Sequence, residues 1–577
     1  MNKLSKKKSA IITSLIVLSL ILIGCGNSGG SDDNTNAPLK KTTVKATQVF
    51  KNGKIYTVND QQEWADAVAL KDNTIIFVGS NDDVKSYVDV STKVVDLAGK
   101  MMMPGFHDVH MHPIESASEN TKFTISFEET NTENYIQAIK EASQANPGNG
   151  WLIGYGHSIF TLLESVRSPL AIIDEAVSDR PVIIMEQTSH SMWVNSAALA
   201  LVGFNKNTEH PTGGRILHDI NTGELNGILI DNAGNIVMDL AMAPTTESLK
   251  NDYAGLIEYT LPELAKHGIT SISDARSFWK RDDHKTWLKA QNNDALTARV
   301  SVGLWAYPMA KDLEQLANLK ALYTNEANSL LKFNQIKLYS DGIIINATSA
   351  MLAAYEMDLI GISENKGLNY FSQERIEQYI TALEPTGFDF HIHAIGDRGI
   401  REALNAIENS GSEQGRHRIT HVEIIDPADI PRFSQLNVTA DAQVAGDFTN
   451  PEHWHENDEL IGAVRSDNAV PIKSLDTAGA RVTLSSDWNV SSFNPFIGLQ
   501  NAVTRAPQDL TLAKAIKAYT LNGAYVMRQE DNVGSIEVGK LADFVILDRN
   551  LFDIDKNTIN QTKIFMTVFD GEIIYQR

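Results

Sequence analysis

The chain has little cysteine and comparatively little positive charge. It contains 577 residues but a single cysteine, Cys25, so no disulfide can form within the chain. Its 50 Lys and Arg residues are outnumbered by 72 Asp and Glu residues, and the formal net charge is −22. A surface of this sign repels phosphate backbones and anionic lipid headgroups. The composition therefore argues against a nucleic-acid-binding protein.

The apolar run near the N-terminus is too short for a membrane-spanning helix. It covers residues 10–23, about 14 residues, whereas roughly 20 are needed to cross a bilayer. Lysines at positions 3, 6, 7 and 8 precede it, and this order is typical of a secretory signal. The run ends in LIGC at residues 22–25, which resembles the lipobox of bacterial lipoproteins.

That resemblance implies that residues 1–24 are a signal peptide and that Cys25 is lipidated as the mature N-terminus. The protein would then be exported and anchored to the bacterial cell membrane, with the rest of the chain outside the cytoplasm. A plain signal peptide and an uncleaved anchor are the alternatives. Residues 25–43 contain few large apolar side chains and are predicted to be a flexible tether.

The rest of the chain is predicted to be an α/β protein whose two ends are rich in β-strands. Short β-type runs separated by turns fill residues 44–104 and return at residues 530–577, and we expect them to pair into one small β-sandwich. Between them, eight apolar runs alternate with helical stretches, which predicts a (β/α)₈ barrel over residues 105–529. The eight runs cover residues 104–112, 268–275, 298–306, 333–342, 388–396, 417–425, 437–443 and 481–488. The gap after the first run is too long for one crossover, so a subdomain is expected at about residues 113–245.

Five residues of metal-ligand type fall at the ends of predicted barrel strands. His110 and His112 end the first strand, and alternation places both on one face. Two adjacent imidazoles suit zinc, although this motif alone is a weak signal. His393, His421 and Asp487 end the fifth, sixth and eighth strands. Because barrel enzymes build their sites at the carboxyl ends of strands, these side chains are predicted to converge.

Lys337 lies in the fourth predicted strand, in the segment QIKLYSD. A lysine that faces clustered metal ions has a lowered pKa, and its neutral amine can react with carbon dioxide. The resulting carbamate would bridge two metal ions as a carboxylate does. The alternative is that Lys337 only pairs with Asp341 or another acid.

Several motifs together resemble the amidohydrolase superfamily. Within it they are similar to the family 3 branch of YtcJ-like proteins and N-substituted formamide deformylases. The motifs lie at residues 104–112, 336–342, 393–398, 416–421, 485–488, 496–505 and 534–545, and the resemblance covers residues 44–577. His107, Val109 and Ser485 depart from the usual residues of these motifs, but no ligand is lost.

The resemblance implies a role for each candidate residue. His110 and His112 would hold the more buried metal, His393 and His421 the second, and Lys337 would bridge as a carbamate. Asp487 would hold metal and water and act as the general base. The cofactor would be a divalent metal, zinc above all, in one or two ions.

Other polar and aromatic residues leave alternatives open. His190, in the predicted insertion, would donate a hydrogen bond to substrate or would be a satisfied surface histidine. His391 shares a strand face with His393 and would be a stray ligand or, in preference, a structural or substrate-side residue. Four tryptophans would line a pocket or, by default, pack in the core: Trp193, Trp279, Trp305 and Trp488.

The implied activity is hydrolysis of a non-peptide C–N bond, in an amide, an N-formyl group or a cyclic amide, of a small molecule. The first alternative is a mononuclear deaminase or amidine hydrolase on the same fold. The second is a surface binding lipoprotein with an inactive barrel. The substrate and the oligomeric state, including a homo-oligomer, stay open.

Overall fold

The computed structural model describes residues 44–577 except 118–121, 127, 187, 358, 447–449 and 451. The predicted signal peptide, Cys25 and the tether lie outside the described residues. Within the described part of the chain, no helix combines the length and the apolar character needed to cross a membrane.

The centre of the protein is a ring of eight parallel strands. In sheet order they run β21-β20-β19-β18-β17-β16-β15-β8, and a parallel bridge between Met111 and Trp488 joins the last strand to the first. Every one of the eight predicted runs is a strand of this barrel, so the predicted fold class is confirmed. The strands are β8 Phe106–Met111, β15 Ile269–Ser277, β16 Arg299–Trp305, β17 Leu331–Tyr339, β18 Asp389–Ala394, β19 Arg418–His421, β20 Thr439–Ala442 and β21 Arg481–Leu484.

Helices cover the barrel, and their apolar spacing explains how they pack. In α12, Asp397–Ser410, the buried side chains include Ile400, Leu404 and Ile407, which lie on one face at intervals of three and four residues. Gly411 ends this helix in the left-handed conformation that glycine adopts without strain. The predicted helix at residues 372–385 is also present, as α11 Gln373–Leu383.

The predicted helical stretch at residues 246–267 contains a change of helix type. It consists of α7 Thr246–Gly255, a π-helical turn at Leu256–Thr260 and α8 Leu261–Lys266. Pro262 lies in the first turn of α8 and has no N–H to donate to the preceding turn. A wider turn at this point accommodates the missing bond.

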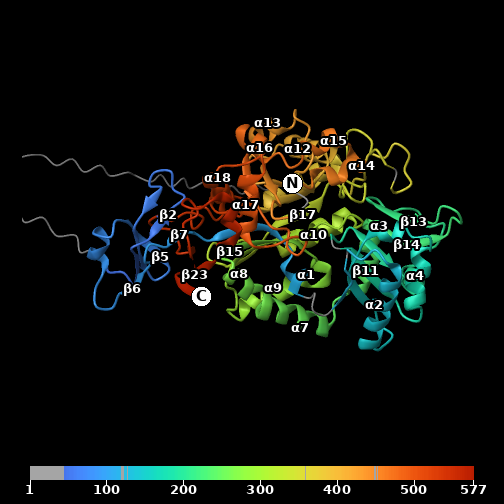
Figure 1. Cartoon of the computed structure of the whole chain (residues 1–577), viewed down its shortest axis with the longest axis horizontal. Coiled ribbons are helices and arrows are strands. Elements are labelled where there is room, and N and C mark those ends of the chain that lie inside the picture. The colour runs from blue at the N-terminus through green and yellow to red at the C-terminus, as the bar shows by residue number, and fades with distance from the viewer. Residues whose placement is uncertain are drawn as a thin grey trace, which may run out of the picture. The chain divides into compact units, whose positions relative to one another are not determined.

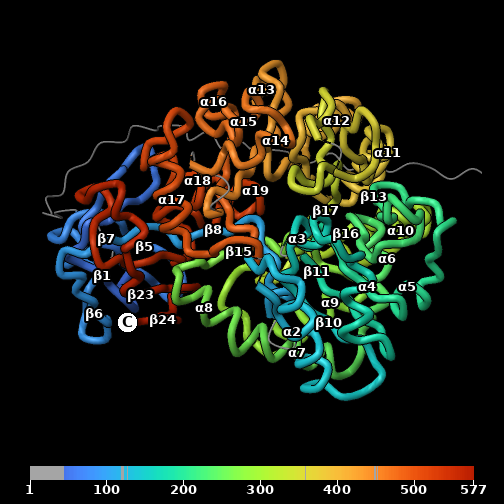
Figure 2. Tube along the Cα trace, turned by 45° about the vertical axis from the view of Figure 1, so that its right-hand side comes forward, coloured from blue at the N-terminus to red at the C-terminus, as the bar shows by residue number. Residues whose placement is uncertain are grey.

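Both ends of the chain build one β domain. Strand β22, Phe544–Leu547, pairs antiparallel with β7, Met101–Pro104, in a six-stranded sheet of order β24-β23-β22-β7-β2-β3. A second sheet, β5-β4-β1-β6, faces a shared core in which the rings of Phe50 and Phe544 lie 5.1 Å apart. Figure 2 shows these N-terminal and C-terminal segments side by side. The prediction of a sandwich made from both ends is confirmed.

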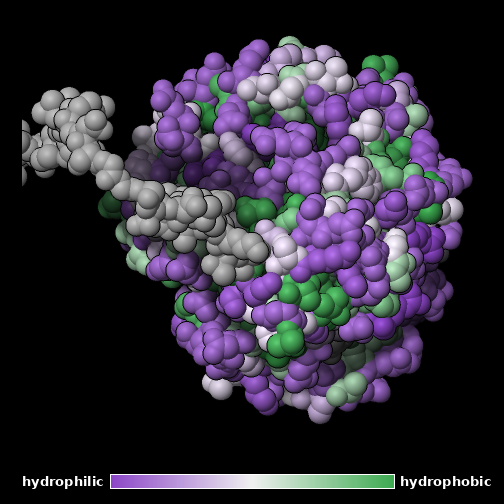
Figure 3. All heavy atoms as spheres, turned by 90° about the vertical axis from the view of Figure 1, so that its left-hand side faces the viewer, coloured by the Kyte–Doolittle hydropathy of each residue, from purple (hydrophilic) through white to green (hydrophobic). Residues whose placement is uncertain are grey.

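The remaining bounds of the β domain follow. Its N-terminal strands are β1 Gln48–Lys51, β2 Lys54–Tyr56, β3 Trp64–Ala65, β4 Ala67–Lys71, β5 Thr74–Gly79 and β6 Lys93–Asp96, and its C-terminal strands are β23 Ile564–Phe569 and β24 Glu572–Gln576. Hydrophilic side chains dominate the face seen in Figure 3, and hydrophobic ones form only small groups there.

The segment between the first two barrel strands contains its own six-stranded sheet. The order is β13-β14-β12-β11-β10-β9, and the bounds are β9 Phe123–Thr124, β10 Leu152–His157, β11 Val182–Glu186, β12 Ser191–Val194, β13 Gly214–His218 and β14 Leu225–Asp231. An apolar cluster around Trp193 forms its core. In Figure 1 this sheet lies on the side of the barrel away from the β domain. The predicted inserted subdomain is therefore present.

Candidate active site

The structure brings the predicted ligand residues together at the carboxyl ends of the barrel strands. Oδ1 of Asp487 lies 3.2 Å from Nε2 of His110 and 3.0 Å from Nε2 of His112. The His421 ring centroid is 5.0 Å from that of His110 and 4.4 Å from that of His393. Residues from four different strand ends therefore share one buried site.

The backbone is strained where two of these residues leave their strands. His421 has φ 77°, Val422 φ 44° and Asp487 φ 55°, all in the left-handed region that non-glycine residues seldom occupy. The Asp487 N–H donates to the His110 carbonyl at 2.8 Å, which holds this turn. Strain of this kind gathers at functional sites, because the surrounding structure must impose it.

The hydrogen bond of His393 determines which ring nitrogen is available. Its Nε2 donates to the carbonyl oxygen of Gly342 at 3.1 Å, and a carbonyl can only accept. Nδ1 therefore carries the lone pair, and it is buried without a hydrogen-bond partner. The Tyr339 ring stacks on the imidazole with centroids 4.1 Å apart and fixes its plane.

Lys337 is fully buried, and its Nζ has no hydrogen-bond partner. Burial holds the pKa of this amine well below its ordinary value, so the neutral form is favoured. The alternative pairing with Asp341 is not present. The Asp341 carboxylate instead accepts backbone N–H groups of Ala350, Ile395 and Gly396.

Burial also favours the neutral form of His110, His393 and His421. It lowers the pKa of His421 to about 3, with a nearby lysine as a further cause, and holds the pKa of His110 and His393 well below the ordinary value. Burial alone would raise the pKa of Asp487, but the facing imidazoles of His110 and His112 outweigh it and hold that pKa low. Neutral imidazoles and an ionised carboxylate are the protonation states that metal ligands need.

Two clusters of described residues have the spacing of a metal site, and they share His110. In the first, ligand atoms of His110, His112 and Asp487 lie within 4.8 Å of one another. In the second, His391 and Asp441 replace the last two residues. The Asp441 carboxylate, however, already accepts hydrogen bonds from the side chains of Thr420, Gln443, Thr483 and Ser485. The first cluster therefore suits a cation better.

His391 lies beneath the site. Its Nε2 is 3.1 Å from Nδ1 of His110, and its Nδ1 accepts from the Arg418 guanidinium at 2.7 Å. It is fully buried and does not line the cavity described next. These contacts favour the structural role expected for His391 over a role at the substrate.

A cavity of about 170 Å³ opens over the predicted ligands. His112, His393, His421 and Asp487 form its polar floor. The apolar part of its wall consists of Ile343, Ile344, Ile345, Ile395 and Val490. Small molecules bind in such largely apolar clefts with a few polar groups.

His190 reaches this cavity from the inserted subdomain. Its Nδ1 lies 2.6 Å from the Asp231 carboxylate, and its ring stacks on Tyr339 with centroids 5.5 Å apart. The side chain is 5% exposed and lines the cavity, so the alternative of a surface histidine does not describe it.

Three residues of the site were not recognised in the sequence. Arg276 contacts both carboxylate oxygens of Glu115 at 3.0 Å and donates to the Tyr339 hydroxyl at 2.9 Å. Glu115 in turn lies 3.3 Å from Nδ1 of His112. Glu423 lines the cavity, and burial, with two nearby acids, raises its pKa to about 8. Arg276 is the penultimate residue of the second barrel strand and Glu423 follows His421 by two residues, so position along the strand was a usable signal.

The four tryptophans do not line this cavity. Trp193 and Trp305 are fully or almost fully buried, and the Trp305 ring packs on Tyr339 at 4.6 Å. Trp279 donates to the Trp305 carbonyl at 2.9 Å, and Trp488 packs on Phe493. Core packing, the default expectation, is what the structure shows.

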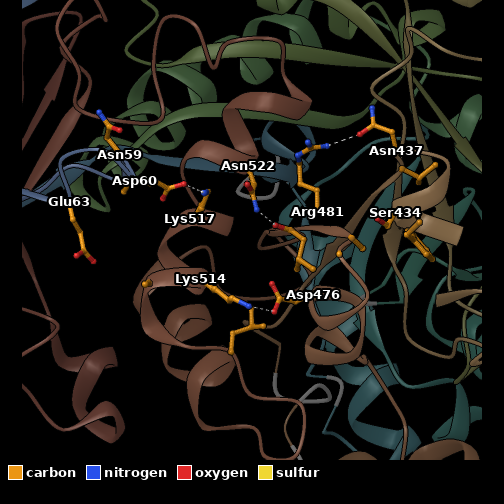
Figure 4. Close-up of a pocket in the computed structure, with 18 of the residues that line it drawn as sticks. Asn59, Asp60, Glu63, Ser434, Asn437, Asp476, Arg481, Lys514, Lys517 and Asn522 are labelled. Atoms are coloured by element: carbon orange, nitrogen blue, oxygen red, sulfur yellow. Dashed lines mark hydrogen bonds and ion pairs between the residues drawn. The ribbon is translucent and has the colours of Figure 1, made fainter. Parts of the chain in front are cut away.

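A second, larger cavity of about 740 Å³ lies at the opposite ends of the barrel strands (Figure 4). Four of its charged side chains form two ion pairs: Asp60 with Lys517 at 3.4 Å and Asp476 with Lys514 at 2.5 Å. Arg481 donates to Asn437 at 3.2 Å. No histidine lines it, so it offers no comparable set of ligand atoms.

Comparison with known proteins shows the family to which the chain belongs. The sequence profile of the amidohydrolase family matches residues 93–575. The chain is 28% identical to a protein called putative amidohydrolase YtcJ from Bacillus subtilis (strain 168), over 92% of this chain and 99% of that one. It is 24% identical to the N-substituted formamide deformylase of Arthrobacter pascens, over 91% and 98% of the two chains.

The fold also matches a solved structure. An uncharacterized metal-dependent hydrolase from Pyrococcus horikoshii OT3 superposes with a TM-score of 0.69 at 22% identity, over 88% of this chain and 99% of that one. The family profile spans most of the chain, including every strand of the barrel. This chain belongs to the amidohydrolase family.

Proposed function

We propose that the protein is a metal-dependent hydrolase that cleaves a non-peptide C–N bond of a small molecule, in an amide, an N-formyl group or a cyclic amide. One observation supports this most strongly: ligand atoms of His110, His112 and Asp487 lie within 4.8 Å of one another, and His112 and Asp487 line a cavity. Structural zinc sites are usually closed by cysteine and histidine, whereas a carboxylate on an open cavity suits catalysis.

The residues present fit a pair of divalent metal ions, with zinc the best match to imidazole and carboxylate donors. His110, His112 and Asp487 would hold one ion, and His393 and His421 the other. The unpartnered Nζ of Lys337 and Nδ1 of His393 support this assignment, because buried polar atoms without partners are costly unless a ligand meets them. Lys337, as a carbamate, would bridge the two. When bound, such ions lower the pKa of water and polarise a carbonyl group.

Asp487 is the proposed general base. Its carboxylate lines the cavity and is held by two imidazoles, so it can take a proton from the attacking water and return it to the leaving nitrogen. His190 is the proposed substrate-positioning residue. Because Asp231 engages its Nδ1, Nε2 is the atom left to meet the carbonyl group of a substrate.

The test is metal analysis of purified protein lacking residues 1–25, followed by a screen of N-acyl and N-formyl amides. We expect about two metal equivalents and hydrolysis that stops with chelator. One equivalent and an unmodified Lys337 would instead favour the mononuclear deaminase or amidine hydrolase. Metal binding without turnover of any amide or amidine would favour a binding lipoprotein.

We also propose that the enzyme acts outside the cytoplasm, held to the bacterial membrane by lipid on Cys25. The basic start, the short apolar run and LIGC at residues 22–25 support this. Full-length protein should incorporate labelled fatty acid and sediment with membranes, and Cys25→Ser should do neither. Equal labelling of the variant would refute the anchor.

A further inference from the structure

Glu423 carries a carboxyl group and lines the active-site cavity, and its backbone is fixed by hydrogen bonds. It follows β19 by two residues and lines the cavity beside His421. Its carbonyl accepts from the Val470 N–H at 2.7 Å, and the next N–H, of Ile424, donates to Ile395 at 2.9 Å. These two hydrogen bonds fix the backbone at Glu423, so the point from which its side chain extends is also fixed.

The other charged groups of the cavity wall have partners of opposite charge or hydrogen-bond partners. Arg276 is paired with Glu115, and Asp487 with two imidazoles. Within the described part of the chain, no salt bridge or side-chain hydrogen bond engages the Glu423 carboxyl group. The nearby acids Asp341 and Asp487 have the same sign and cannot neutralise it.

Glu423 is half-buried and shares its cavity with many apolar side chains. Four isoleucines, at positions 343, 344, 345 and 395, line the same cavity. A carboxyl group in such a space is costly unless a partner meets it. Since the described residues provide none, the complementary partner is a group that enters the cavity.

We propose that Glu423 binds a cationic amine nitrogen of the substrate. The substrate would then be an amide that carries a second, positively charged nitrogen, separated from the scissile bond by a short apolar chain that packs on the isoleucines. This inference rests on the proposed hydrolase function and names the class of substrate for the same site. A site that pairs a carboxyl group with a charged nitrogen discriminates against analogues that lack this nitrogen, so Glu423 is a specificity residue rather than a catalytic one.

The experiment uses the metal-loaded enzyme and three probes of similar length: N-(4-aminobutyl)acetamide, N-pentylacetamide and 4-acetamidobutanoate. Binding is measured by calorimetry and hydrolysis by amine or acetate release, for wild type, Glu423→Gln and Glu63→Gln. The last variant is a matched control, because it removes an equal charge from the cavity at the other end of the barrel. Thermal melting establishes that each variant folds.

Wild type is expected to bind the amine-bearing amide about 10- to 100-fold more tightly than the neutral one, and Glu423→Gln to lose that preference. The variant should gain affinity for the carboxylate probe, and Glu63→Gln should behave as wild type. Hydrolysis without any preference for the amine would overturn the Glu423 assignment and leave the hydrolase intact. Amine-selective binding that needs Glu423, without turnover of any amide, would keep the assignment and overturn the hydrolase.

Discussion

The two cavities at opposite ends of the barrel differ in size and in electrostatics. The cavity at the amino ends of the strands is larger, about 740 Å³ against 170 Å³, yet both of its lysines form ion pairs with acids of the same cavity. The smaller cavity is lined by buried imidazoles and by residues with strained backbone, and one of these imidazoles, that of His393, has a buried nitrogen without a hydrogen-bond partner. Buried polar atoms that the protein itself does not satisfy, rather than volume, mark the end where chemistry is expected.

Removal of the proposed base, Asp487, from the smaller cavity is expected to cause the largest loss of activity. Asp487→Asn keeps the size of the side chain but loses the carboxylate that lies 3.2 Å from His110 and 3.0 Å from His112. We expect kcat/KM to fall about 1,000-fold or more, with metal content also reduced. Steady-state kinetics on any amide found in the screen measures it. A fully active Asp487→Asn enzyme would remove the base from the mechanism.

Replacement of Lys337 is expected to weaken metal binding while it stabilises the metal-free fold. Lys337→Met removes the buried amine at similar volume, so we expect loss of one or both metal ions and at least a 100-fold loss of activity. The metal-free variant should melt at a higher temperature than metal-free wild type, because an unpartnered buried amine destabilises the fold. Metal analysis, melting curves and labelled-bicarbonate NMR of the carbamate test this. Normal metal content in the variant would argue against the bridge.

A substitution at Arg276 tests whether residues that position a predicted metal ligand, without binding metal themselves, affect activity. Arg276→Met leaves the Glu115 carboxylate without its bidentate partner, next to His112. We expect activity to fall about 10- to 100-fold through disturbed positioning of His112, with metal affinity falling in parallel. If activity falls while metal affinity is unchanged, Arg276 contacts the substrate instead.

Acid should weaken the fold through buried histidines such as His157, which belongs to neither cavity. Burial lowers its pKa from 6.5 to about 3, so the folded state binds fewer protons than the unfolded state between these values. Its contribution is complete above pH 6.5 and is lost as the pH falls toward 3, at most about 1.4 kcal/mol per unit. Denaturant titrations at pH 7 and pH 5 should show a smaller loss for His157→Gln. An identical loss would assign the acid sensitivity to other groups.

The smallest effects are expected at the larger cavity. Lys514→Ala breaks an exposed ion pair with Asp476, and such pairs contribute about 0–1 kcal/mol. Activity should stay within about twofold of wild type, and the melting temperature should change little. A large loss of activity would show that this cavity also takes part in function.

The sequence alone determined the architecture and which candidate ligand residues meet at one end of the barrel. All eight barrel strands were predictable, because strands buried on both faces read as short apolar runs between helical segments. His110, His112, His393, His421 and Asp487 were predictable as a group, because the carboxyl ends of parallel strands must meet at one face. Neither inference needs any distance, since both follow from strand alternation and from closure of the sheet.

Only the tertiary structure decided the partners of each side chain. That Arg276 joins Glu115 to Tyr339, and that Glu423 has no described partner, depends on segments far apart in the chain. The free nitrogen of His393 likewise follows from a carbonyl on another strand end. Periodicity in the sequence tells which face a residue occupies, whereas pairing, burial and protonation depend on what packs against that face, which is set when the barrel closes.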